Sequence, residues 1–157
     1  MLRRHLAAPN GADHVERHAA TFLARGIHAV DRGHYDELHA MRIAGKRLRY
    51  NIEFFSERLA PEKATALGLM ALIQDRLGAV ADADALLKRL GGIVAALEQD
   101  DPRRKGLAHC VTAARAEREQ AIAAIRSLWT GDGHAPYPDM LAAAVATALA
   151  SSSSKDG

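Results

Sequence analysis

The sequence is poor in residues that stabilise a fold through covalent or metal cross-links. It holds a single cysteine, Cys110, among 157 residues. An intramolecular disulfide and a cysteine-based zinc cluster are therefore excluded, and one cysteine fits a reducing compartment. The 48% hydrophobic content is enough for a core without such cross-links. We expect one compact cytoplasmic domain that carries neither metal nor cofactor.

Long apolar runs and aromatic residues are also scarce. The first eight residues contain no apolar run of signal-peptide length, and no segment approaches the roughly 20 apolar residues of a membrane span. We therefore expect a soluble protein without a membrane partner. Aromatic residues make up 4% of the chain. This is too few for the stacking platforms that read RNA or single strands, so sequence-specific nucleic-acid binding is not expected.

The pattern that is present is helical. Ala, Leu and Arg dominate, and apolar residues recur at steps of three and four between Gly or Pro residues. Asp13 is predicted to cap a first helix, with Glu16 completing a capping box. The helices expected are 13–31, 35–59, 61–97 and 103–130, with Gly78 and the Gly91-Gly92 pair as candidate bends or breaks in the third. Short connections favour an all-α, up-and-down four-helix bundle.

These helices define the predicted organisation of the chain. The bundle occupies residues 13–130, after an N-terminal extension over residues 1–12. Gly, Pro and Ser concentrate from Gly131 onward. Residues 131–157 are therefore expected to form one short helix, 139–150, and a disordered tail without chemistry.

One segment of the second helix is strongly basic. The formal net charge is only +2, yet residues 39–50 carry four fixed positive charges and no acid. At about 100° per residue, one face collects His39, Arg42, Lys46, Arg49 and Tyr50, whereas Arg47 lies on the far side. Like charges three and four residues apart cost about 0.2–0.5 kcal/mol per pair, so an anion should offset them.

The sequence offers two sources of that anion. Glu53, Asp75 or Asp82 could pair with the basic face inside the protein, as charge runs on helices often do. Alternatively, the basic face flanks the apolar seam and lines a groove, where one sign of charge collects a polyanion. The planar fork of arginine suits phosphate, and His39 and Tyr50 can add hydrogen bonds at the ends of the row.

Residues 38–50, with the pattern H-x-x-R followed by K-R-x-R-Y, resemble the hallmark helix of CHAD domains, the conserved histidine α-helical domains. Residues 72–78 followed by Asp82 are similar to that family's L-x-Q-D-x-L-G-x-x-x-D segment. The chain resembles the C-terminal half of such a domain. By position, the resemblance assigns the basic helix of the family to His39, Arg42, Lys46, Arg49 and Arg47, and gives Asp82 the role of orienting a base.

The resemblance implies a helical, non-catalytic protein that binds inorganic polyphosphate and associates with polyphosphate granules. Family members usually contain two such bundles, whereas this chain has one copy of the motif. It is either a piece of a longer protein or a half-domain that forms a homodimer and so rebuilds two bundles. Basic residues on other helices could extend the surface, namely Arg17, Arg25, Lys88, Arg89, Arg115 and Arg118.

Two other classes of function fit parts of the sequence. A histidine phosphotransfer domain is also a four-helix bundle with a histidine and a base three residues later, as His39 and Arg42 are. In that class a small residue follows the base, but here Ile43 does, and Gly45 comes two residues after it. A metal-binding bundle could use His14 and His18, but no repeated Glu-x-x-His pair supports it.

Overall fold

The computed structural model describes residues 11–150, and they form five α-helices and one 3₁₀ turn. The elements are α1 (Gly11–Arg32), α2 (Tyr35–Phe54), η1 (Ser56–Arg58), α3 (Lys63–Ala96), α4 (Arg103–Thr130) and α5 (Tyr137–Ala150). The predicted all-α class is confirmed. The predictions for the N-terminal extension and the C-terminal tail fall largely on residues 1–10 and 151–157, outside the described part.

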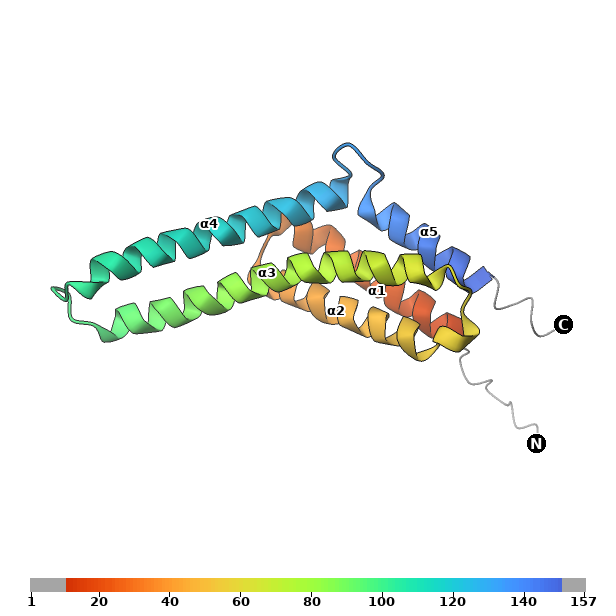
Figure 1. Ribbon diagram of the computed structural model, residues 1–157, viewed down its shortest axis with the longest axis horizontal. Coiled ribbons are helices and arrows are strands. Elements are labelled where there is room, and N and C mark those ends of the chain that lie inside the picture. The colour runs from red at the N-terminus through yellow and green to blue at the C-terminus, as the bar shows by residue number, and fades with distance from the viewer. Residues whose placement is uncertain (1–10, 151–157) are drawn as a thin grey trace, which may run out of the picture.

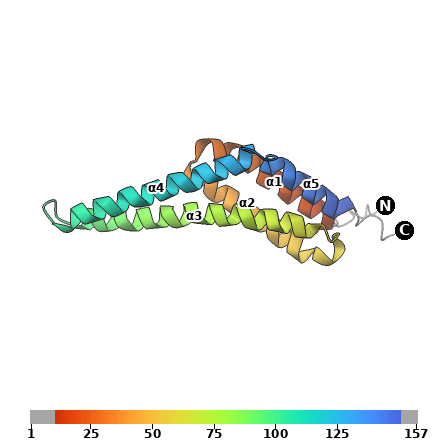
Figure 2. The same cartoon turned by 45° about the horizontal axis from the view of Figure 1, so that its top comes forward.

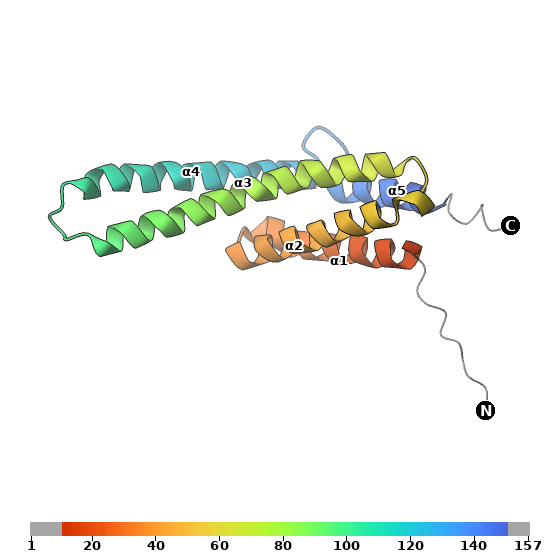
Figure 3. The ribbon, with the colours of Figure 1, turned by 60° about the horizontal axis from the view of Figure 1, so that its bottom comes forward.

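The helices pair as two antiparallel hairpins of unequal length. Figure 1 shows α1 and α2 side by side, and α3 and α4 forming a longer hairpin that extends well past the α1–α2 turn. The views in Figures 2 and 3 show the same projection of the long hairpin, with α5 folded back along the opposite end. The molecule therefore has a packed end, where all five helices meet, and a distal end made of α3 and α4 alone.

The packed end holds the hydrophobic core. Apolar positions at steps of three and four on each helix turn inward, as the sequence predicts. Fully buried side chains come from every helix, including Phe22, Met41, Leu48, Ile73, Ile125 and Leu141. On α3 the buried residues run from Ala66 to Ala83 at close intervals, with only Leu90 beyond.

Helix α5 belongs to this core, although it lies beyond residue 130, where the predicted bundle ends. Tyr137 is fully buried, and its hydroxyl donates a hydrogen bond to the Leu69 carbonyl oxygen at 3.0 Å. Its ring stacks on Trp129 with centroids 5.7 Å apart. Gly131, with φ of 81°, ends α4 in the left-handed region and lets the chain fold back. The segment expected to be peripheral thus supplies a central aromatic residue, and the packed end contains one helix more than predicted.

Helix α3 is continuous through the three glycines that were candidate bends. Gly78, Gly91 and Gly92 all lie within it. None of the three adopts a positive φ. Each glycine costs a helix about 1 kcal/mol relative to alanine, and packing along α4 offsets that cost. By length and composition α3 could also cross a membrane. One face of it, made of Ala66, Met70, Ile73, Leu77, Val80 and Ala83, is buried against the other helices, and 28% of the apolar window is buried in total.

Several helix ends differ from the prediction: α3 begins at Lys63 and α5 at Tyr137, each two residues from the expected start, and larger differences fall on α1 and α2. Helix α1 already includes Gly11, so Asp13 lies in its first turn and is not its N-cap. The Phe55 ring can approach Gly11 closely because glycine has no side chain. A Cβ at this position would lie 2.6 Å from the ring. Helix α2 ends at Phe54, five residues early, because the chain tightens into η1 before Pro61.

Candidate functional site

The candidate site is a row of side chains along α2 that begins near the α1–α2 turn. Its members follow one another at steps of four and three residues, which places them on one face of the helix. The row consists of Tyr35, His39, Arg42, Lys46 and Arg49. Another face of α2 carries the buried residues of the core, among them Leu38, Met41, Leu48 and Ile52. The predicted placement of the basic face beside the apolar seam therefore agrees with the structure.

The first part of the row lies against α3. A shallow crevice between the two helices is lined by side chains of both, namely Tyr35, Leu38, His39, Arg42, Leu77, Val80, Ala81 and Asp84. The His39 ring stacks on Tyr35 with centroids 5.8 Å apart and an interplanar angle of 16°. Both rings remain exposed. His39 is therefore held in place on one side and open to solvent on the other.

The middle of the row carries two positive charges without protein partners. Arg42 and Lys46 are half-buried. Within residues 11–150 neither side chain forms a hydrogen bond or an ion pair. Since a pair of like charges one turn apart is unfavourable, this part of the helix is left with an uncompensated positive potential.

Arg49 ends the row and connects it to the second motif. Its Nε donates to Glu53 Oε1 at 2.8 Å, and its Nη1 donates to Gln74 Oε1 at 3.3 Å. The hydrogen bond to Glu53 raises the pKa of Arg49 above its ordinary value. Tyr50 lies next to it with 59% of its surface exposed. Of the two anion sources considered for the row, internal pairing holds for Arg49 alone.

Arg47 points to a different part of the surface. It is exposed and acts electrostatically on His18 of α1. Burial, followed by the nearby Arg17, His14 and Arg47, lowers the pKa of His18. The resemblance makes Arg47 a candidate binding residue. The structure places it on the face of α2 that is turned toward α1, away from the α2 row.

The acid that lines the crevice beside His39 and Arg42 is Asp84, not Asp82, whereas Asp75 acts electrostatically on Arg49. Asp82 is exposed, without an ion pair in the described structure. Asp84 lines the crevice and accepts a 2.6 Å hydrogen bond from Arg118 Nε. Their side chains are only 15% and 17% exposed. The periodicity could have identified Asp84, because it continues the inward steps of Ile73, Leu77 and Val80, whereas Asp82 falls on the opposite face.

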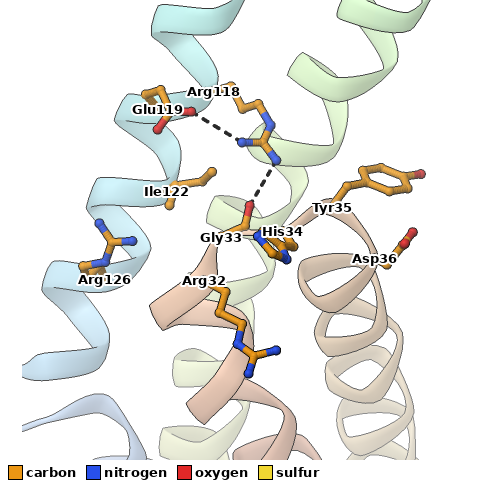
Figure 4. A pocket seen from close by; sticks show the side chains of 9 residues that line it. All are labelled: Arg32, Gly33, His34, Tyr35, Asp36, Arg118, Glu119, Ile122 and Arg126. Atoms are coloured by element: carbon orange, nitrogen blue, oxygen red, sulfur yellow. Dashed lines mark hydrogen bonds and ion pairs between the residues drawn. The ribbon is translucent and has the colours of Figure 1, made fainter.

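A second hollow lies at the α1–α2 turn, next to α4. This cleft has a volume of about 550 Å³, and Figure 4 shows the arginines of α4 facing the turn across it. Arg118 Nη2 donates to the Gly33 carbonyl, and Arg126 Nη2 donates to those of Val30 and Asp31. Arg32 pairs with Glu37 at 3.1 Å. The guanidinium groups of Arg118 and Arg126 thus satisfy carbonyls at the end of α1 and hold the two hairpins together.

The other basic residues considered in the sequence are dispersed. Arg17 and Arg25 are exposed on α1, and Lys88, Arg89 and Arg115 are exposed on the long hairpin. In residues 11–150, no three His, Cys, Asp or Glu side chains converge as a metal-ligand set. His14 stacks on Phe55 at 5.9 Å. The α2 row is therefore the feature on which a binding site can be built.

Comparison with known proteins agrees with the motifs of α2 and α3. No curated protein matches the chain significantly. The family model of the CHAD domain matches residues 4–90, which include α1, α2 and most of α3. This is the N-terminal part of the chain, and its correspondence to the C-terminal half of a CHAD domain stays a prediction. Because the match covers more than half of the chain, the protein belongs to the CHAD domain family.

Proposed function

We propose that this protein binds inorganic polyphosphate along α2, without catalysis, through His39, Arg42, Lys46 and Arg49. The CHAD family is associated with polyphosphate binding. The observation that carries the proposal is the pair of half-buried cations, Arg42 and Lys46, without partners in residues 11–150. A row of fixed charges at regular steps fits a linear anion with a phosphate at each step better than a compact one.

The members of the row contribute differently. Arg42 and Lys46 supply full charge, since no acid of the described structure pairs with them. Arg49 shares its charge with Glu53 but keeps a side chain that is 42% exposed. His39, stacked on Tyr35, offers a ring nitrogen to the anion. The row from His39 to Arg49 spans about 15 Å at 1.5 Å per residue.

Phosphotransfer through His39 is less well supported. That class of protein needs a small, exposed residue close to the histidine on the same helix, so that a partner domain can approach. Gly45 is buried, and a Cβ there would lie 3.1 Å from the Phe22 ring and 3.3 Å from the Met70 Cε atom. Gly45 therefore sets the spacing of α1, α2 and α3, and it is not a small surface residue beside His39 that a partner domain could approach.

The test is a titration of the purified chain with long-chain polyphosphate at two salt concentrations, with duplex DNA as competitor. We expect tight, salt-sensitive binding that DNA displaces poorly, because counterion release accompanies each neutralised phosphate. Simultaneous replacement of Arg42, Lys46 and Arg49 by Glu should abolish binding and keep the helical circular dichroism spectrum. Binding by this variant would reject the α2 row as the site. Binding at granules in cells follows from the same proposal and should disappear with the same variant.

A further inference from the structure

The distal part of the long hairpin lacks the core that the packed end has. The α1–α2 turn reaches along the hairpin as far as Asp84 and Arg118, where Gly33 accepts a hydrogen bond from Arg118. Beyond that level, only Leu90 is buried on α3 and only Ala114 on α4. Figures 1 to 3 show these helical turns projecting with only each other as neighbours. Two helices can bury one seam between them, which leaves their outer faces in solvent.

The outer face of α3 is more apolar than a solvent face requires. Leu86 is 42% exposed and Ile93 is 49% exposed. Ala79, which is also exposed, lies seven residues before Leu86. A seven-residue spacing of apolar side chains is typical of a helix that packs along another helix.

The charges on this face complement themselves. Asp82 and Arg89 interrupt the apolar positions on either side of Leu86, and both are exposed. In an antiparallel pair of α3 helices centred at Leu86, Asp82 of each copy lies beside Arg89 of the other. The same alignment sets the small Ala79 opposite the large Ile93. A parallel pair would bring Asp82 against Asp82 and Arg89 against Arg89, which is repulsive.

We propose that the distal hairpin is the interface of a two-fold symmetric homodimer, in which α3 packs antiparallel on α3 of a second copy around Leu86. The two hairpins together form a four-helix assembly in which Leu86, Ile93 and Ala79 are buried. An isologous contact of this kind closes on itself, because the same surface serves both copies. The α2 row lies on another face of the molecule and stays open in the dimer.

The first experiment is sedimentation equilibrium of the full chain, without polyphosphate, for the wild type and charge-reversal variants. The wild type is expected to be a dimer at micromolar concentration. Asp82→Arg and Arg89→Asp should each weaken the dimer at least tenfold, and the double variant should restore it because the charges exchange places. Lys105→Asp, an exposed reversal on the same hairpin outside this face, is the matched control and should remain dimeric.

A second experiment tests the register. Leu86→Cys in a Cys110→Ser background should form a disulfide-linked dimer under mild oxidation, because Leu86 faces its own copy at the two-fold axis. Thr112→Cys, exposed on α4 away from this face, should not cross-link in that background. A monomeric wild type, a dimer indifferent to both single reversals, or partition of monomers onto phospholipid vesicles would each overturn the proposal.

Discussion

Replacing Arg42 and Lys46 together by Gln separates binding from folding. Neither side chain has a hydrogen-bond or ion-pair partner within residues 11–150, so neutralisation removes no such interaction from the fold, and Gln keeps most of the aliphatic stem. It also relieves a like-charge pair worth about 0.2–0.5 kcal/mol, so the free energy of unfolding should stay level or rise slightly. Binding should respond in the opposite direction. Two charge-assisted contacts at about 1.5 kcal/mol each amount to about 3 kcal/mol, or a roughly 100-fold loss of affinity for polyphosphate.

The assay is fluorescence anisotropy with labelled polyphosphate at four salt concentrations. For a single-stranded polyanion, each neutralised phosphate contributes about 0.7 to the slope of log affinity against log salt. The slope of the double variant should therefore be shallower by about 1.4. Arg47→Gln, which removes a charge on the α1 side of the same helix, should leave slope and affinity nearly unchanged. An unchanged slope in the double variant, or an equal loss with Arg47→Gln, would refute the assignment of the row.

Three further outcomes follow from individual contacts. Glu53→Gln removes the acid that pairs with Arg49 at the end of the row, so the affinity for polyphosphate should rise a few-fold. The free energy of unfolding should fall by at most about 1 kcal/mol because the pair is exposed. Weaker binding would contradict this. Asp84→Asn breaks a largely buried ion pair and should destabilise the fold by about 2 kcal/mol in urea denaturation. At a protein concentration where the chain is monomeric, Asp82→Asn should change the free energy of unfolding by less than about 0.5 kcal/mol. Equal costs would restore Asp82 as the structural acid. The lowered pKa of His18 means that the unfolded chain binds its proton more readily, so this residue reduces stability as pH falls below 6.5. Arg47→Gln should raise the pKa of His18 in an NMR titration. An unchanged pKa would show that Arg47 does not lie near His18.

Much of the fold could be predicted because helical periodicity is a local property. The steps of three and four that bring Leu38, Met41 and Leu48 inward are visible in the printed sequence and agree with the burial. The sequence did not predict that helix α5 packs into the core, and the reason is physical. Its anchor, Tyr137, contacts Leu69 and Trp129. Leu69 lies 68 residues before Tyr137, and a contact between residues so distant along the chain leaves no periodic signal in the sequence.

The site was predicted in part for the same reason. His39, Arg42, Lys46 and Arg49 lie on one helix, and helical geometry alone places them on one face. The structure therefore keeps the predicted grouping. Which acid approaches that face depends on the rotation of α3 against α2, and the motif alone favoured Asp82.

The sequence by itself therefore determined the helices, their apolar seams and the one basic face, since these depend only on 3.6 residues per turn. Only the tertiary structure decided which charges remain unpaired. Arg49 meets Glu53 and Gln74, Arg118 meets Asp84, and Arg42 and Lys46 meet no acid of the described residues. Pairing of this kind depends on how neighbouring helices are rotated and how far they project, because an ion pair forms only when two charges come within about 4 Å.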